Sequence, residues 1–236
     1  IEHNTTAKYI KNTKKVVNDC LAKGWLKANP FANFKIATKL VDRNFLSESE
    51  LDILANKELK VERIAIVRDI FVFSCYTGLS YIDVANLTPN QIAIGMDREK
   101  WIFTSRQKTN TASHIPILPP AMEIINRYKD HPAAINKGRL LPGLSNQKMN
   151  AYLKEIDDLC GIHKDLTFHV ARHTFATTVT LTNGVPIESV SKMLGHKKLQ
   201  TTQHYAKILD KKVSQDMSIL FKRFKPKSKL KKAANK

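Results

Sequence analysis

The sequence predicts a mainly helical protein that contains one small antiparallel β-sheet of three strands. Apolar residues recur at helical spacing over most of the 236 residues. Between residues 91 and 118 the pattern changes to short β-rich segments separated by turn residues, and after residue 119 it is helical again. With 42% hydrophobic and 25% charged residues, the composition is that of a globular protein rather than a disordered chain.

The first segments predict a helix followed by a linker. Residues 5–23 have an amphipathic pattern, Gly24 is placed to end the helix, and Asn29-Pro30 is a turn signal. Residues 34–43 are expected to form the linker, which places a domain boundary near residue 40. Because residues 1–33 are too few to build a core, they are interpreted as the last helix of an upstream domain.

The second domain is predicted to begin with a capped helix and a buried one. Ser47 followed by Glu50 three residues later matches a capping box. The nearly all-apolar helix 61–75 suits the centre of a domain. Strands are expected at 91–94, 101–105 and 114–118, and helices at 119–129, 145–160, 168–182, 187–194, 201–205 and 211–224.

The charge of the chain predicts a polyanionic partner. Lys and Arg number 39 against 21 acids, a net charge of +18. Residues 222–236 carry eight of these bases and no acid, yet the rest still has a net charge of +10. Such an excess favours binding to nucleic acid, because each neutralised phosphate releases counterions. A basic protein with a flexible tail is the alternative.

Several other classes of protein are disfavoured. No apolar run is long enough for a membrane span, and three widely spaced cysteines form neither a disulfide framework nor a zinc site. His169 and His173 have the spacing of a zinc pair, but Val170 stands where zinc proteases need Glu. No P-loop is present, which disfavours a nucleotide-hydrolysing site. Neither a metal nor another cofactor is expected. We expect a cytoplasmic protein that is part of a longer chain.

The residues best suited to chemistry lie near the end of the chain. His169 and Arg172 are three residues apart on a predicted helix, so they share a face. A planar guanidinium beside an imidazole can bind a phosphate. The alternative is a structural role, with His169 in the core and Arg172 in an ion pair.

Together these residues form a pattern that resembles the tyrosine recombinases, the phage integrase family. Its parts are Leu166-Thr-Phe-His-Val-Ala-Arg-His-Thr-Phe-Ala-Thr, Val190-Ser-Lys-Met-Leu-Gly-His and Thr201-Thr-Gln-His-Tyr, in that order. Upstream, Tyr76-Thr-Gly-Leu-Ser-Tyr-Ile-Asp-Val-Ala-Asn-Leu resembles the first box of the family, and Ser105-Arg-Gln-Lys-Thr lies in the hairpin where the family has a lysine.

The resemblance implies an enzyme that cleaves and rejoins DNA through a 3′-phosphotyrosine, without ATP or metal. Tyr205 would be the nucleophile, and Arg172 and His196 would bind the phosphoryl oxygens. His169 would accept a proton or a hydrogen bond, and Lys108 would protonate the leaving 5′-oxygen.

The sequence departs from the family at Ser80, where the first box usually has a phosphate-binding arginine. Asp83 still occupies the acidic position that supports the site. Integrases of Bacteroides-type conjugative and mobilisable elements resemble the chain here and also have Ser. Arg68 is the expected substitute, because it projects from an apolar helix face. A salt bridge to a core acid, or a long stem lying on apolar surface, are the alternatives.

By resemblance, residues 1–33 are the end of a DNA-clamping core-binding domain, 44–221 the catalytic domain and 222–236 a basic tail. Double-stranded DNA at attachment sites is the expected partner. A homotetramer on DNA is expected, and helix 211–224 either docks on a neighbour or packs on its own domain. Element or host accessory factors and a location at the bacterial nucleoid are also expected. A catalytically inactive DNA-binding protein and a type IB topoisomerase-like enzyme are the rivals. The sequence does not determine the DNA target sequence, the direction of recombination or the oligomeric state without DNA. It also leaves open whether Tyr205 acts in cis or in trans and which residue is the general base.

Overall fold

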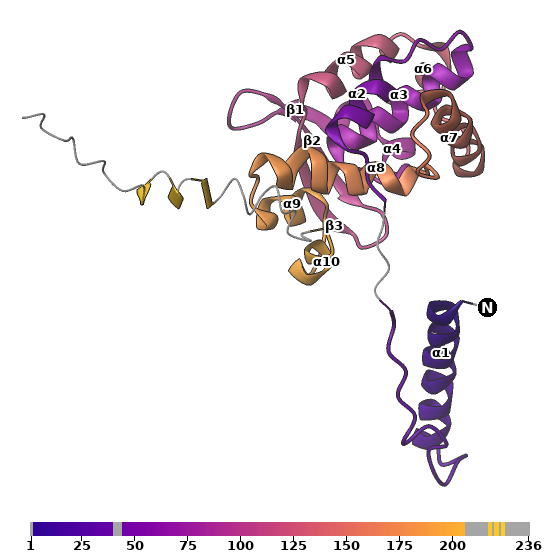
Figure 1. The fold of residues 1–236 in the computed structure, drawn as a ribbon. Helices are drawn as coiled ribbons and strands as arrows, with labels where there is room; N and C mark the ends of the chain where they lie inside the picture. Colours follow the sequence, from indigo (N-terminus) through magenta and orange to yellow (C-terminus); the bar gives the residue numbers. More distant parts are fainter. Residues whose placement is uncertain (1, 40–43, 206–216, 219, 222, 225–236) are drawn as a thin grey trace, which may run out of the picture. The chain divides into compact units, whose positions relative to one another are not determined.

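The chain divides into two compact units, residues 1–43 and 44–236 (Figure 1). The computed structural model describes residues 2–39, 44–205, 217–218, 220–221 and 223–224. Most of the predicted helix 211–224 and of the basic tail 222–236 therefore lies outside the described residues. No helix in the described ranges is long and apolar enough to cross a membrane.

The first unit is built on helix α1 (His3–Ala22), which confirms the predicted helix. The chain then returns along it: the Asn4 amide and the Lys39 backbone exchange hydrogen bonds of 3.0 and 2.8 Å. The Lys14 ammonium lies over the rings of Phe31 and Phe34. The described part of the expected linker, residues 34–39, is thus held against α1 by hydrogen bonds.

The second unit is organised around α3 (Glu62–Thr77). This helix packs against α2 (Glu48–Asn56), α5 (Pro119–Tyr128), α7 (Asn146–Cys160) and α8 (Phe168–Thr174) (Figure 1). Because α3 is apolar around most of its circumference, neighbours can bury it on several sides. Phe71 and Phe73 are completely buried. The prediction of a central helix is confirmed.

The sheet has three antiparallel strands in the order β1 (Ile92–Ile94), β2 (Lys100–Arg106) and β3 (Thr111–Pro116). Ile102 and Ile115 pair directly and are both fully buried, so they lie on the core face. The three-stranded sheet is as predicted, but β3 runs from Thr111 to Pro116 rather than over residues 114–118. It begins earlier because Thr111 already pairs with Arg106 across the turn. The short elements α4 (Tyr81–Asn86), η1 (Pro89–Gln91) and α6 (Pro132–Ile135) were not predicted.

The predicted helix 168–182 changes its winding along its length. Helix α8 continues as a π-helix, η2 (Phe175–Thr180), and ends as a 3₁₀ turn, η3 (Leu181–Asn183). Threonine hydroxyls bond back to preceding carbonyls here, Thr177 to His173 and Thr180 to Phe175 and Ala176. Such bonds compete with the regular helical pattern. Helices α9 (Ile187–Met193) and α10 (Leu199–Gln203) follow.

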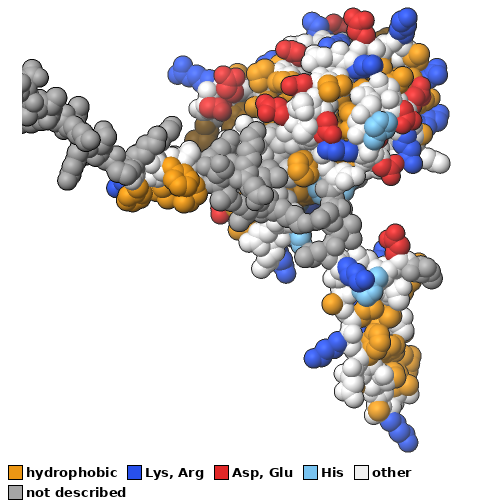
Figure 2. Space-filling model, in the orientation of Figure 1, with side chains coloured by type: hydrophobic (Ala, Val, Ile, Leu, Met, Phe, Trp, Pro, Cys, Tyr) orange, Lys and Arg blue, Asp and Glu red, His pale blue; other side chains and the backbone are white. Residues whose placement is uncertain are grey.

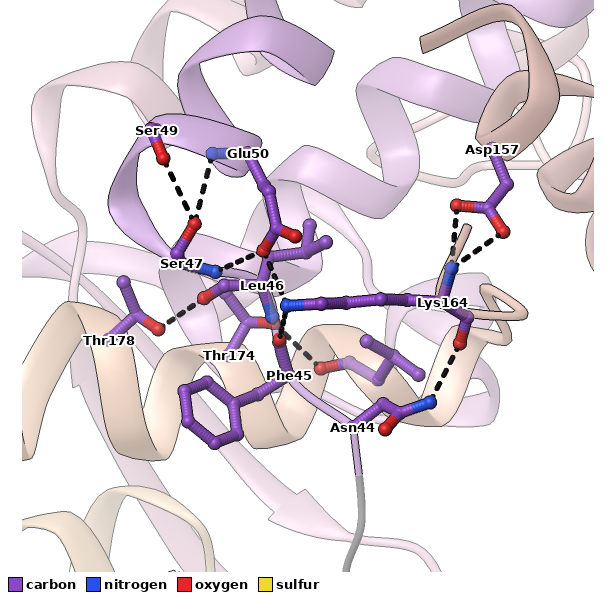
Figure 3. A network of polar contacts seen from close by, with 11 residues as sticks. Asn44, Phe45, Leu46, Ser47, Ser49, Glu50, Asp157, Lys164, Thr174 and Thr178 are labelled. Atoms are coloured by element: carbon purple, nitrogen blue, oxygen red, sulfur yellow. Dashed lines mark hydrogen bonds and ion pairs between the residues drawn. The ribbon is translucent and has the colours of Figure 1, made fainter. Parts of the chain in front are cut away.

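The first residues of the second unit are attached to this helical segment (Figure 3). The Leu46 backbone N–H donates to the Thr174 hydroxyl at 3.0 Å, and the Thr178 hydroxyl donates to the Leu46 carbonyl. The Lys164 ammonium donates to the Phe45 carbonyl at 3.0 Å and to the Glu50 carboxylate at 2.6 Å. The capping box of Ser47 is present as predicted. Leu46 is fully buried, so the chain enters the unit at a fixed place.

We expect Thr174→Val to destabilise the protein by about 1–3 kcal/mol, because the buried Leu46 N–H would lose its acceptor. Urea unfolding followed by circular dichroism measures the loss. The matched control is Thr201→Val, since Thr201 is exposed and should change stability by less than about 0.5 kcal/mol. Equal midpoints for the two variants would contradict this account of the anchor.

Candidate active site

The buried guanidinium of Arg172 is the centre of the candidate site. Arg172 projects from α8 and is 3% exposed. It donates to the carbonyl of Gly78 at 2.7 Å, to the carbonyl of Leu194, and to His196 Nε2 at 3.0 Å. Gly78 ends α3 and Leu194 ends α9. The Arg172 side chain therefore connects the C-terminal ends of α3 and α9 to α8.

Two glycines allow this close approach. Gly78 has φ of +70°, and a Cβ there would lie 2.4 Å from the Phe175 ring. Gly195 has φ of +61°, and a Cβ there would lie 3.2 Å from Cβ of Arg106 on β2. Glycine is needed at both, since other residues rarely adopt positive φ. Gly195 thus lets the β2–β3 hairpin lie against the segment that carries His196.

Tyr205 lies beside its own chain's Arg172, in a row of rings. The ring centroids of His169 and His173 are 4.6 Å apart, those of His173 and Tyr205 are 4.9 Å apart, and those of Tyr205 and His196 are 6.1 Å apart. The structure therefore brings together His169, Arg172, His196 and Tyr205, four of the residues selected from the sequence. His173 was not selected, although it lies within the same motif.

Burial and neighbouring charges shift the pKa values of two of these groups. Burial, and then the charge of Arg106, lower the pKa of Arg172 to about 10, although interactions with Tyr205 and Asp83 oppose the shift. Burial, followed by the charges of Arg172 and Arg106, lowers the pKa of His196 to about 4. At neutral pH Arg172 is therefore charged and His196 is neutral.

Arg106 is a site residue that the sequence analysis missed. It is the last residue of β2, and its Nε is buried with no hydrogen-bond partner among the described residues. Its charge acts on both Arg172 and His196. The sequence contains a pattern that could have identified it, because the alternation of side chains along β2 places Arg106 on the same face as buried Ile102.

Ser80 and Asp83 connect this strand to α4. The Ser80 hydroxyl donates to Asp83 at 2.6 Å, and the backbone N–H of Gln107 donates to the other carboxylate oxygen of Asp83 at 3.0 Å. Asp83 is 7% exposed. It therefore holds the hairpin at the residue next to Arg106.

Two predicted residues are not part of this cluster. Lys108 is exposed in the β2–β3 turn, without a hydrogen bond to the part of the chain that the structure describes. Arg68 points elsewhere: its guanidinium bonds to Asp69 and to the carbonyls of Ala55 and Lys57, at 2.9 and 2.7 Å, at the end of α2. The expectation that Arg68 replaces the arginine missing at Ser80 is therefore corrected. A salt bridge in the core, the alternative considered above, is what the structure shows.

An open pocket of about 320 Å³ adjoins the row of rings at His169. Its wall is largely uncharged and comes from the starts of α4, α7 and α8. The lining residues are Ser80, Tyr81, Ile82, Asn146, Asn150, Thr167, Phe168 and His169.

The surface of the second unit seen in Figure 2 carries acidic and basic side chains side by side.

Comparison with known proteins places the chain in a family. The model of the phage integrase family matches residues 45–212, which include every residue of the cluster. The chain belongs to the phage integrase family. This confirms the resemblance read from the motifs.

Relatives of this integrase-family chain are tyrosine recombinases. It is 28% identical to the tyrosine recombinase XerD of Lacticaseibacillus casei, over 85% of the chain and 71% of that protein. It is 31% identical to XerD of Halalkalibacterium halodurans, over 56% of the chain and 46% of that protein.

Solved structures share the fold at lower identity. A lambda integrase dimer bound to a core site aligns with a TM-score of 0.68 at 18% identity, covering 86% of the chain and 73% of that structure. The Tn1549 transposon integrase with a circular intermediate DNA aligns with a TM-score of 0.66 at 15% identity, covering 93% and 80%. The predicted fold, a tyrosine recombinase catalytic domain, is confirmed.

The lowered pKa of His196 predicts a pH-dependent stability. An unfolded histidine titrates near 6.5, so between about pH 6.5 and 4 the unfolded chain binds a proton that folded His196 does not. Stability should therefore fall as the pH drops through this window. In His196→Gln this fall should be smaller. Urea midpoints of both proteins between pH 4 and 8 measure the difference, and parallel curves would contradict the assigned shift.

Proposed function

We propose that the chain cleaves and rejoins DNA strands, with Tyr205 as the nucleophile. The observation that supports this best is the position of Tyr205 beside the guanidinium of Arg172, which itself lies near the guanidinium of Arg106. Burial, and then the repulsion from Arg106, lower the pKa of Arg172. A DNA phosphate between them would relieve that repulsion. Two fixed cations there would also stabilise the charge that develops on the phosphoryl oxygens.

In the proposed reaction the Tyr205 oxygen bonds to phosphorus and the bond to the 5′-oxygen breaks. The tyrosine proton passes to a neighbouring imidazole, for which His169 and His173 are the candidates, and Lys108 supplies a proton to the leaving oxygen. Because the phosphotyrosine conserves the energy of the broken bond, a 5′-hydroxyl can reverse the step without ATP. Tyr205 packs beside Arg172 of its own chain, so we propose that it acts in cis.

We propose that Arg106 takes the role that the sequence analysis gave to Arg68. Ser80 carries no charge for a phosphate, but it bonds to Asp83, and Asp83 in turn bonds to the hairpin next to Arg106. Lys108 follows two residues later in the same hairpin. We expect it to contact DNA from its exposed position in the turn.

Partners and domain roles are part of the proposal. The solved relatives named above are complexes with DNA, and the charge of +18 suits the same partner. We propose that α1 belongs to a DNA-clamping domain, that residues 44–221 are catalytic, and that the active form is a tetramer on DNA. The family name favours integration by a mobile element. Its kinship with Bacteroides-type integrases stays a prediction.

The first experiment looks for a covalent protein–DNA adduct. The substrate is a pool of duplexes with a randomised segment and a nick in one strand, so that cleavage near the nick releases a short fragment and traps the intermediate. We expect denaturant-resistant adducts from wild-type protein and none from Tyr205→Phe. Sequencing the trapped DNA identifies the site.

The same experiment separates the rival functions. Retention of DNA without any adduct would favour the catalytically inactive protein of the same fold. Adducts without sequence preference, together with ATP-independent relaxation of a supercoiled plasmid, would favour the type IB topoisomerase-like enzyme. Adducts that persist in Tyr205→Phe would exclude Tyr205 as the nucleophile.

Replacement of Arg106 tests the substitute cation. We expect Arg106→Ala to slow adduct formation on the selected DNA by at least about 100-fold, as expected when a transition-state donor is lost. Arg106→Lys should recover part of the rate. The control is Arg68→Ala: it should lower the unfolding midpoint but change the adduct rate of the folded protein much less. A larger rate loss in Arg68→Ala than in Arg106→Ala would reverse the assignment.

A further inference from the structure

The C-terminal end of α9 is held by side chains from three other segments. The backbone carbonyls of residues 193–195 accept hydrogen bonds from Ser113 on β3, Arg172 on α8 and Thr109 in the β2–β3 turn, in that order. The Thr109 contact is the longest, at 3.4 Å. A carbonyl oxygen can only accept, so both hydroxyls must be donors. These bonds satisfy carbonyls that a helix end leaves without partners inside the helix.

The β2–β3 hairpin and the end of α9 also touch directly. A Cβ added to Gly195 would lie 3.2 Å from Cβ of Arg106 and 3.6 Å from Cβ of Ser113. Ser113 is 3% exposed and Gly195 is buried, so little space separates the two segments. Arg106 and Ser113 are on the hairpin face that is turned toward α9. The contact at Ser113 therefore also determines where Arg106 lies relative to the end of α9.

Lys108 lies between two attached residues of the same hairpin. The backbone N–H of Gln107, on one side, donates to Asp83 at 3.0 Å. The hydroxyl of Thr109, on the other side, donates to the carbonyl of Gly195. The side chain of Lys108 is exposed. Its neighbours therefore locate the backbone of Lys108, whereas its ammonium is accessible to a substrate.

We propose that Ser113 and Thr109 are positioning residues that hold the hairpin, and with it Lys108, against the end of α9. The inference rests on the proposed function for the role of Lys108 as proton donor to the leaving 5′-oxygen. The attachment of the hairpin is a property of the protein without DNA. Loss of either hydroxyl should let the hairpin move away from α9, so that protonation of the leaving oxygen is slowed while DNA binding is little changed.

Three variants separate these contacts from general changes in the hairpin. Ser113→Ala removes one donor. Thr109→Val removes the other at nearly constant volume and at a half-buried position, so it should fold even if Ser113→Ala does not. Ser105→Ala is the matched control, because Ser105 is an exposed serine of β2 whose hydroxyl has no hydrogen bond to another residue that the structure describes.

The first measurement is amide hydrogen exchange by NMR in the protein without DNA. The reporters are Gln107, whose N–H donates to Asp83, and Asn110, whose N–H donates to the carbonyl of Arg106 at 2.8 Å. In Ser113→Ala and Thr109→Val these amides should exchange about fivefold faster, a larger change than in α3. In Ser105→Ala they should exchange as in wild type. Unchanged exchange in both variants would overturn the proposal, whatever the activity of the protein.

The second measurement compares single-turnover adduct formation on two versions of the selected nicked DNA. One has the natural 5′-oxygen at the scissile phosphate, and the other has sulfur in its place. When the phosphorus–sulfur bond breaks, sulfur leaves as a thiolate and needs no proton, because a thiol is much more acidic than an alcohol.

Ser113→Ala should slow the reaction of the oxygen substrate by about tenfold or more, but that of the sulfur substrate by less than about threefold. Thr109→Val should show the same pattern with a smaller loss, and the Kd for uncleaved DNA should stay within about twofold of wild type. Equal losses on the two substrates, or a loss that Ser105→Ala shares, would overturn the proposal.

Lys108→Ala distinguishes failure of this inference from failure of the proposed function. It should lose more rate than Ser113→Ala on the oxygen substrate and recover with sulfur. Equal losses of Lys108→Ala on both substrates would refute its proposed role as proton donor, and absence of any adduct from wild type would refute the proposed function as a whole. In either case the exchange measurement would still decide whether Ser113 and Thr109 hold the hairpin.

Discussion

The hydrogen bonds of the buried Arg172 guanidinium are the interaction on which the arrangement of the second unit depends. A charged group that is 3% exposed must find partners, and here they are two carbonyls at helix ends and the imidazole of His196. Gly78 and Leu194 are thereby brought to one point, although they are far apart in the sequence. The same contacts leave the guanidinium next to Tyr205, so the group that orders the helix ends is also available to an anion.

Excess positive charge within the site follows from this arrangement. Arg106 approaches because Gly195 has no Cβ, and Asp83 holds the backbone of the hairpin beside it. Burial and then the charge of Arg106 lower the pKa of Arg172, and burial and then both cations lower the pKa of His196 and keep it neutral. A phosphate beside Arg172 and Arg106 would offset this positive charge, in agreement with the proposed function.

The contacts of Leu46 and of His196 show how the helices around the site are connected. The hydroxyl of Thr174, which follows Arg172 and His173, accepts a hydrogen bond from the Leu46 backbone N–H. The hydroxyl of Thr202, three residues before Tyr205, is within hydrogen-bond distance of the His196 ring. Both are buried threonines whose hydroxyls satisfy groups from other segments. Thr174, the last residue of α8, and Thr178 in the π-helix lie four residues apart, and both bond to the backbone of Leu46.

The sequence by itself determined the class of fold, the order of the elements and the family. Periodicity reports local burial, and the ordered motif with Arg172, His196 and Tyr205 is local to three short segments. The tertiary structure decided that Arg106, and not Arg68, lies near Arg172 and His196. Arg68 and Arg106 both project from apolar faces, so no local pattern separates them. Long-range contacts separate them, because the guanidinium of Arg68 bonds to carbonyls at the end of α2, whereas the missing Cβ of Gly195 leaves room for Arg106.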